Sequence, residues 1–136
     1  MGESIRRREA LNWYEGALVD LDEAEAALSG ERPNWALFAS QQAVEKALKA
    51  AYIVLKRERP PRTHDLVELH RNLGIQLSED LTEALSELTP YYSVARYPNA
   101  GLEKPWRGIS RSLARRLVEA SKRIVEEVGV SANLRR

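Results

Sequence analysis

Polar side chains that could bind a phosphate or move a proton gather at three places in this 136-residue chain. The first is the stretch 41–51, where Gln42, Glu45, Lys46 and Lys49 are set among alanines. A lysine beside a groove can hold a phosphate as a point charge. Glu45 and Lys49 also stand four residues apart, the spacing of a favourable ion pair on one helix face. The stretch is therefore either a binding surface or a solvated helix face, and the pattern allows both.

The second place is the pair His64–Asp65. In one interpretation it opens a helix, with Thr63 as the cap, Asp65 favoured by the helix dipole and His64 bonded to a backbone carbonyl. In the other, imidazole and carboxylate join Arg96 in a polar cluster in which the histidine moves protons near neutral pH. His70 lies six residues further on, on a different helix face, so the two histidines do not predict a metal site.

The third place is Arg96-Tyr97-Pro98, which closes a helix before a loop rich in Pro, Asn and Gly. The proline holds Tyr97 in an extended conformation. An arginine at this position can bind a carboxylate or a phosphate with two parallel hydrogen bonds. The guanidinium could equally form a structural salt bridge to Asp65 or Glu45. We expect Arg96 and Tyr97 to belong to the same candidate site as the other two places.

These residues must be positioned by helices, since apolar side chains recur every three or four residues along most of the chain. The pattern predicts helices at residues 4–28, 33–57 and 64–73, a segment from Ser78, and a last helix from Pro105 or Trp106 to Gly129. Asn34 and Thr63 are the expected caps of the second and third helices. Gly74 should end the third helix, and Pro90 should kink or split the segment from Ser78. The prediction is an all-α protein, an up-and-down antiparallel helical bundle of about four long helices plus one short helix.

Length and composition limit the class of protein. The chain is long enough for one domain, with an expected core at residues 4–128 and a frayed tail at residues 129–136. Hydrophobic content of 43% and charged content of 30% suit a soluble globular protein. No apolar run is long enough to span a membrane, and the amino terminus lacks the apolar core of a signal peptide. The absence of cysteine excludes thiolate metal sites and fits a reducing compartment, so the expected location is the cytoplasm.

The net charge of +1 conceals an alternation along the chain. Residues 1–32 and 79–103 are acidic overall, whereas residues 33–78 and 104–136 are basic overall. Neighbouring helices of opposite sign attract one another, which is the simpler interpretation. The alternative is a basic stripe that binds phosphate or nucleic acid.

An ordered set of motifs resembles the HEPN domain (higher eukaryotes and prokaryotes nucleotide-binding), over residues from Trp13 to about Ala120. The motifs, in chain order, are QQAVEKALKA at 41–50, Thr63-His64-Asp65-Leu66, Tyr92 and Arg96-Tyr97-Pro98. The resemblance implies a helical bundle that pairs with itself and is often encoded beside a small nucleotidyltransferase.

Many HEPN proteins are metal-independent ribonucleases, and this resemblance raises the question of RNA cleavage. Their active site is an arginine followed by four to six residues and a histidine, near the start of the last helix. This chain has no histidine after His70, so that position is empty. Arg59 and Arg57 stand at suitable distances before His64, but both lie mid-chain across a double proline. We therefore predict no catalytic residue, no metal and no cofactor.

Three functional hypotheses follow. The first is a non-catalytic, homodimeric HEPN module that binds a nucleotide, an RNA phosphate or a nucleotidyltransferase partner. Its polar groove would be lined by Gln42, Lys46, Lys49, His64 and Arg96, and its interface anchors would be Trp35, Trp106 and Tyr91. The second is the ribonuclease toxin of a toxin–antitoxin pair, with His64 as acid–base group. The third is a purely structural helical adaptor in which every motif residue packs or caps.

Overall fold

A computed structural model of the protein describes residues 2–95 and 108–135, and for residues 2–4 the backbone alone. These two segments are helical and contain no strand, as the sequence predicts. The helices are, in chain order, α1 (Gly2–Ser29), α2 (Pro33–Lys56), α3 (Leu66–Arg71), α4 (Glu79–Leu88), the 3-10 helix η1 (Thr89–Tyr92) and α5 (Arg111–Ser131). None of the helices within these segments combines the length and the apolar character needed to cross a membrane.

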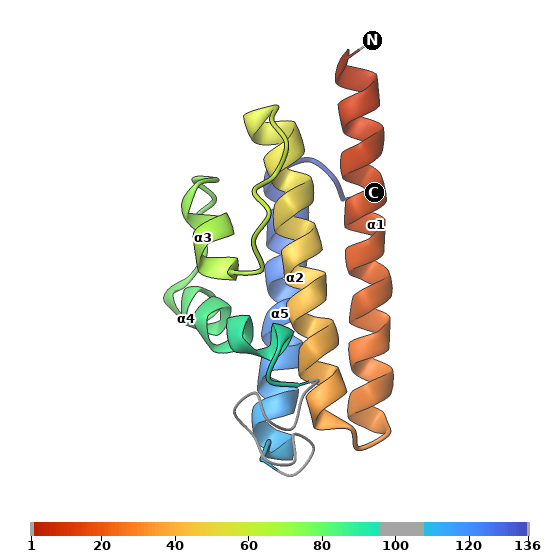
Figure 1. Cartoon of the computed structure of the whole chain (residues 1–136), viewed down its shortest axis with the longest axis vertical. Helices are drawn as coiled ribbons and strands as arrows, with labels where there is room; N and C mark the ends of the chain where they lie inside the picture. The colour runs from red at the N-terminus through yellow and green to blue at the C-terminus, as the bar shows by residue number, and fades with distance from the viewer. Residues whose placement is uncertain (1, 96–107, 136) are drawn as a thin grey trace.

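The helices form a bundle around α2, which packs against α1, α3 and α5 (Figure 1). The chain descends through α1, rises through α2, returns through α3 and α4, and rises again through α5. The short helices α3 and α4 together therefore take the place of the third member of an up-and-down bundle. Of the four helices that were expected to be long, α4 has only 10 residues.

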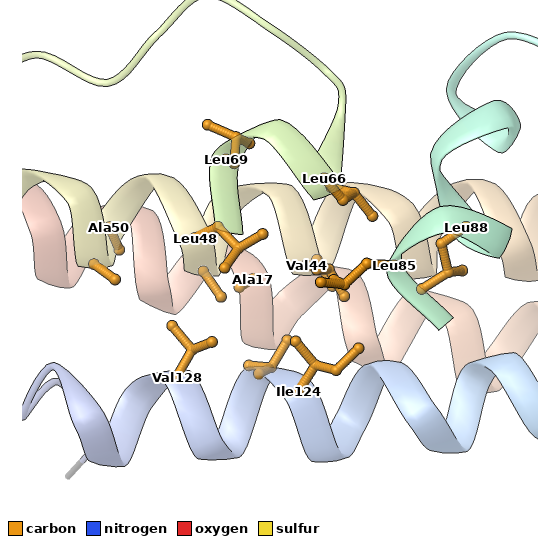
Figure 2. Close-up of a cluster of buried hydrophobic side chains, with 14 of the residues drawn as sticks. Ala17, Val44, Leu48, Ala50, Leu66, Leu69, Leu85, Leu88, Ile124 and Val128 are labelled. Carbon is orange, nitrogen blue, oxygen red and sulfur yellow. The ribbon is translucent and has the colours of Figure 1, made fainter. Parts of the chain in front are cut away.

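The core lies where α2 meets α5 on one side and α3 and α4 on the other (Figure 2). Val44 and Leu48 of α2 are fully buried, and leucines from α3 and α4 point toward them. Helix α1 also packs against α2. It contributes alanines at seven-residue spacing, all fully buried: Ala10, Ala17 and Ala24. Small residues in one row let two helices approach closely, so the alanine-rich surface of α2 is packing surface.

Two of the predicted helix caps are wrong. The third helix begins at Leu66, because the carboxylate of Asp65 accepts hydrogen bonds from the backbone N–H groups of Val67 and Glu68, at 3.0 and 3.2 Å. Thr63 lies outside the helix and accepts a hydrogen bond from Asp65 N instead.

Asn34 is not the cap of α2 either. Its side chain donates to the backbone oxygen of Ala95 at 3.2 Å, and α2 starts with Pro33 behind an N-cap, Arg32, that makes no side-chain bond. Asn34 therefore ties α2 to the segment after η1.

The C-terminal part also differs from the prediction. The last helix starts at Arg111, with Ser110 as its cap, and residues 108–110 are not helical. The predicted starting points, Pro105 and Trp106, lie outside the described residues. Gly129 is inside α5, which continues to Ser131.

The tail that follows α5 is packed and not frayed. Asn133 adopts a left-handed backbone conformation with φ of 55°, which turns the chain back on the bundle. Leu134 thereby reaches the core and is only 1% exposed. The core consequently extends beyond residue 128, the limit expected from the sequence.

Candidate functional site

The candidate site is built on one stripe of α2. Gln41, Glu45, Lys49 and Tyr52 follow one another at spacings of four, four and three residues, so they lie on the same side of the helix. The connection from α2 to α3 runs back beside α2 (Figure 1). It contacts the stripe first where Tyr52 donates to Glu58, at 3.4 Å, and again seven residues earlier on α2, at Glu45.

Glu45 is the centre of the site. Its Oε1 atom accepts a hydrogen bond from Gln41 Nε2 at 3.1 Å and lies 2.9 Å from Nδ1 of His64. Its Oε2 atom accepts from Lys49 Nζ at 3.2 Å, which confirms the predicted pair of Glu45 and Lys49. Glu45 is only 6% exposed, and Gln41 and Lys49 are buried with it. A buried carboxylate needs such partners, because a charge without them would be very costly away from water.

His64 is held at three points. Nδ1 faces Glu45, the backbone oxygen accepts from Gln41 Nε2 at 2.9 Å, and the ring is stacked on Tyr92 of η1. The two ring centroids are 3.5 Å apart and the planes differ by 14°. Because an ionised carboxylate can only accept, Nδ1 carries a proton, and Nε2 of the neutral ring is left as an acceptor. The side chain is nevertheless 47% exposed, so a fixed imidazole faces the solvent.

The structure brings together only part of the predicted site. Glu45, Lys49 and His64 meet, as described above. Lys46 points instead to α1, where its Nζ atom lies 2.7 Å from Asp20. Gln42 donates to Gln41 Oε1 at 2.7 Å, beside a shallow cavity of about 310 Å³ that also borders Asp20.

The remaining predicted site residues are elsewhere. Asp65 caps α3, so its role is the structural one. His70, which was not predicted to belong to the site, contacts the backbone oxygen of Ile75 through Nε2 at 2.7 Å. Arg96 and Tyr97 lie outside the described residues.

The site prediction missed two contributors, Gln41 and Tyr92. Gln41 stands four residues before Glu45, so its place on the same helix face could have been read from spacing. Tyr92 belongs to the family-like motifs, but its stacking on His64 joins positions 28 residues apart, for which the sequence carries no spacing signal. Lys49 has a further neighbour that was not foreseen, since its Nζ atom lies 5.9 Å from the ring centroid of Trp13.

Charged pairs between helices explain much of the charge alternation. Lys46 and Asp20 join the basic second segment to the acidic first one. Arg116 of α5 donates two hydrogen bonds to Glu87 of α4, at 3.1 and 2.6 Å. The hydrogen bond from Arg116 lowers the pKa of Glu87 below its usual value. These pairs are what the attraction between neighbouring helices predicts.

No group of three His, Asp or Glu side chains within residues 2–95 and 108–135 converges in a way that could hold a metal ion. The described site contains one oriented imidazole and a carboxylate with its hydrogen-bond donors. Such a pair can donate or accept a hydrogen bond at Nε2 and can hold a proton.

Known proteins of the same fold were found among solved structures. TT1696 from Thermus thermophilus matches with a TM-score of 0.78 and 33% sequence identity, covering 89% of this chain and 96% of that one. ST0689, an archaeal HEPN homologue, matches with a TM-score of 0.75 and 28% identity, over 90% and 97% of the two chains. An HEPN domain protein from Thermotoga maritima, tm0613, matches with a TM-score of 0.68 and 25% identity, over 90% and 98%. No curated protein matches the chain.

The sequence pattern of the HEPN domain matches residues 10–131, which include all of α2 to α5 and both halves of the Glu45–His64 contact. The structural matches have the same helical fold over nearly their whole length. This protein therefore belongs to the HEPN domain family.

Proposed function

We propose that this protein is a non-catalytic, homodimeric HEPN module that binds a nucleotide or an RNA phosphate at the site formed by Glu45, His64 and Tyr92. One observation supports it above the others: His64 is fixed by Glu45 at 2.9 Å and by the stacked ring of Tyr92, yet about half of its side chain is exposed. A group that is ordered in the free protein loses little entropy on binding. When protonated, its Nε2–H can donate to a phosphate oxygen, while Glu45 stabilises the imidazolium.

The lysines of the motif add less to binding than the sequence predicts. Lys49 is paired with Glu45 and Lys46 with Asp20. A cation whose charge is already compensated attracts a phosphate weakly. Positive charge near His64 comes instead from the exposed Arg59 and Arg62 of the connection between α2 and α3.

Homodimerisation is supported by apolar side chains left on the outside of the bundle. Leu18 and Val19 of α1 are 45% and 55% exposed, and Trp35 of α2, one of the predicted interface anchors, is 44% exposed. Aromatic side chains are enriched in interfaces between proteins. Tyr91 packs against the core, which makes it a poorer anchor, and Trp106 lies outside the described residues. A small nucleotidyltransferase is the alternative partner for the same surface.

A ribonuclease of a toxin–antitoxin pair is the second candidate, and one observation favours it. A carboxylate that orients a half-exposed imidazole is the arrangement of a general acid–base group. Incubation of the protein with a labelled RNA, followed by electrophoresis, tests this directly. Cleavage by the wild type that disappears in His64→Ala would replace the non-catalytic proposal by this one.

Thermal melting against AMP, ATP and a short RNA tests the binding proposal. A ligand present at about a hundred times its Kd stabilises the folded state by about 2.7 kcal/mol, which a melt resolves readily. We expect a rise in Tm with at least one of these ligands, lost in His64→Ala and retained in Lys46→Ala. Lys46→Ala is the control, since it removes a charge from α2, the helix that carries Glu45, but from the face that contacts α1. A purely structural adaptor would show no rise with any ligand.

A further inference from the structure

We propose that His64 is a site of covalent phosphorylation, at which Nε2 accepts a phosphoryl group from an acyl phosphate. This inference goes beyond the proposed function, which uses the same side chain only for reversible binding. It is carried by the hydrogen bond at Nδ1, by the stacking on Tyr92 and by the exposure of the ring.

The tautomer of His64 determines which ring nitrogen is the nucleophile. A neutral imidazole attacks through the nitrogen that has a lone pair, which is the nitrogen without a proton. Glu45 Oε1 lies 2.9 Å from Nδ1 and keeps the proton there. Nε2 therefore has the lone pair, and it forms no hydrogen bond within residues 2–95 and 108–135.

The donor can reach Nε2 from the direction that the reaction requires. The lone pair lies in the plane of the ring, whereas Tyr92 is stacked on a face of it, with centroids 3.5 Å apart and planes that differ by 14°. A ring stacked on the face does not obstruct an approach in the plane. The side chain is 47% exposed although Glu45 occupies the Nδ1 edge. The imidazole is thus held in one orientation and remains accessible, as attack on a phosphorus atom requires.

The charges around His64 suit an anionic donor. As the bond from Nε2 to phosphorus forms, the imidazole becomes positively charged, and a carboxylate at Nδ1 stabilises that charge. Glu45 can do so with little repulsion of the donor, because its carboxylate is buried and paired with the ammonium of Lys49 at 3.2 Å. Arg59 and Arg62, both exposed on the connection that leads to His64, add positive charge that attracts an acyl phosphate.

The acyl phosphate is the only co-reactant that this step needs. The lone pair of Nε2 forms the bond to phosphorus, the P–O bond of the acyl phosphate breaks, and the carboxylate leaves with the electron pair of that bond. No proton is transferred, since Nε2 has none and Nδ1 keeps its own beside Glu45. The phosphoryl group adds negative charge where the proposed function places an anionic ligand, so the phosphorylated protein should not bind that ligand.

His70 is a control within the same chain. Its Nε2 atom lies 2.7 Å from the backbone oxygen of Ile75, and because a carbonyl oxygen can only accept, this Nε2 carries a proton. The nitrogen that is nucleophilic in His64 is therefore blocked in His70. A reaction that needed only a histidine would label both residues, whereas the structure predicts labelling of His64 alone.

Intact-protein mass spectrometry after incubation with acetyl phosphate tests the inference, at about pH 8, where an ordinary histidine is neutral. We expect one phosphoryl group per chain, in a bond that acid cleaves and alkali leaves intact. Phosphorus NMR should place this group on Nε2. His64→Ala should abolish the labelling, and His70→Gln should be labelled as fast as the wild type. Circular dichroism melts of each variant verify that it is folded.

Glu45 is a positioning residue in this proposal, so its replacement should change which nitrogen reacts. In Glu45→Gln the group that faces Nδ1 is an amide, which can donate as well as accept, and both tautomers of His64 become possible. We expect labelling to be slower by about tenfold or more and to be divided between Nε2 and Nδ1. A loss of stability alone would not divide the label. The double variant Glu45→Gln/Lys49→Met, which also removes the buried ammonium, provides the same test if the single variant does not fold.

Several outcomes would overturn the inference: no label from acetyl phosphate, a label on Nδ1 of the wild type, or labelling of His70 as fast as that of His64. Long-range proton–nitrogen NMR of the unmodified wild type would also overturn it by showing the proton of neutral His64 on Nε2. The melts with AMP, ATP and RNA judge the proposed function separately. A rise in Tm without labelling would leave only the proposed function, and labelling without such a rise would leave only this inference.

Discussion

Glu45 bears its charge at a point that water hardly reaches, and the surrounding residues show how that charge is tolerated. Gln41 and Lys49 come from the same helix, one turn before and one turn after it, whereas His64 comes from the connection to α3. The local partners are available as soon as α2 forms. The third partner requires the chain to fold back along α2, so the carboxylate couples the position of His64 to the packing of the bundle.

The first prediction concerns the charge of Glu45. Glu45→Gln keeps the size of the side chain but leaves the ammonium of Lys49 buried without its counter-charge. The amide N–H of the new glutamine can also face this ammonium. Breaking a buried pair in this way destabilises a protein by about 3 kcal/mol. We expect the free energy of unfolding, measured with urea, to fall by this amount. We also expect this loss to change little between 0.1 and 1 M salt, because buried pairs are poorly screened.

A second substitution tests whether the uncompensated ammonium of Lys49 causes this loss of stability. In the double variant Glu45→Gln/Lys49→Met the uncompensated ammonium is gone, and the stem that packs near Trp13 is kept. Most of the lost stability should return. If the double variant lost as much free energy of unfolding as the two single variants together, the two side chains would act independently, contrary to their 3.2 Å contact.

At the scale of elements, the packing of α1 against α5 depends on one glycine. Tyr14 of α1 donates its hydroxyl hydrogen to the backbone oxygen of Val125 at 2.9 Å, and burial raises the pKa of this phenol. The hydroxyl lies so close to Gly129 that a Cβ atom there would overlap with it. Gly129 therefore does not end α5, as glycines often do, but gives the tyrosine room between the two helices.

The second prediction follows from this contact. Gly129→Ala should destabilise the protein by about 2 kcal/mol, because the added methyl group forces the tyrosine out of its position. Gly16→Ala is the matched control in α1, where a Cβ atom would lie 3.4 Å from a flexible carbon of Lys46. It should stabilise by up to about 1 kcal/mol, since alanine is the better helix former. If thermal melts showed that both substitutions change the stability in the same direction, this explanation would be refuted.

The third prediction concerns the ion pair that joins α4 to α5. The hydrogen bond from Arg116 holds the pKa of Glu87 below its ordinary value of 4.5 in the folded protein. Stabilisation by this carboxylate is therefore complete above pH 4.5 and is lost as the pH falls through the lowered pKa. Glu87→Gln should cost about 0.5 to 1 kcal/mol at pH 7, since both partners are partly exposed.

The test is the difference in stability between wild type and Glu87→Gln as a function of pH and salt. We expect the difference to shrink below about pH 4 and in 1 M NaCl, where exposed charges are screened. A difference that stayed constant down to pH 2 would mean that packing, and not charge, accounts for the effect.

The helices could be predicted from the sequence, but several of their ends and much of the site could not. Periodic apolar residues located α1 and α2 well, because burial of one face decides where a long helix forms. The predicted caps failed for two reasons: Asp65 caps α3 in place of the neighbouring Thr63, and Asn34 bonds to Ala95, a residue distant in sequence. A choice of this kind is made by tertiary contacts, which spacing does not encode.

The same limit applies to the candidate site. The pair of Glu45 and Lys49 was predictable because both partners lie on one helix. Lys46, although adjacent to Glu45, faces α1, and only the position of Asp20 on a neighbouring helix explains this. The stacking of His64 on Tyr92 depends on the return of the chain through α3 and α4, which no local pattern shows.

At the scale of the whole molecule, the segment after α5 packs against α1 on one side of the bundle. The C-terminal segment turns at Asn133 and comes back to α1, where Arg7 donates to the backbone oxygen of Asn133 at 2.9 Å. A groove of about 460 Å³ remains between α1 and α5, with an apolar wall that includes Leu18. The outside of α1 thus carries apolar side chains that the monomer leaves exposed, which is the basis for expecting self-association.

The last prediction is that this exposed surface of α1 contributes to the proposed dimer. Val19 is 55% exposed, so Val19→Arg removes little packing within one copy and should leave its melting temperature nearly unchanged. In a dimer the same change would bury a charge without a partner, which is costly at an interface. Analytical ultracentrifugation should therefore show a dimer for the wild type and a shift toward monomer for Val19→Arg.

Gln76→Arg is the control for this experiment, because it adds the same charge to an exposed position between α3 and α4, on the other side of α2 from α1 (Figure 1). It should leave the dimer intact. If Gln76→Arg dissociates the dimer and Val19→Arg does not, the copies meet through α3 and α4, close to His64. The nucleic-acid site would then lie at the interface, and binding of RNA would depend on protein concentration. If α1 forms the interface, the two sites face outward, and each should bind RNA independently of the other.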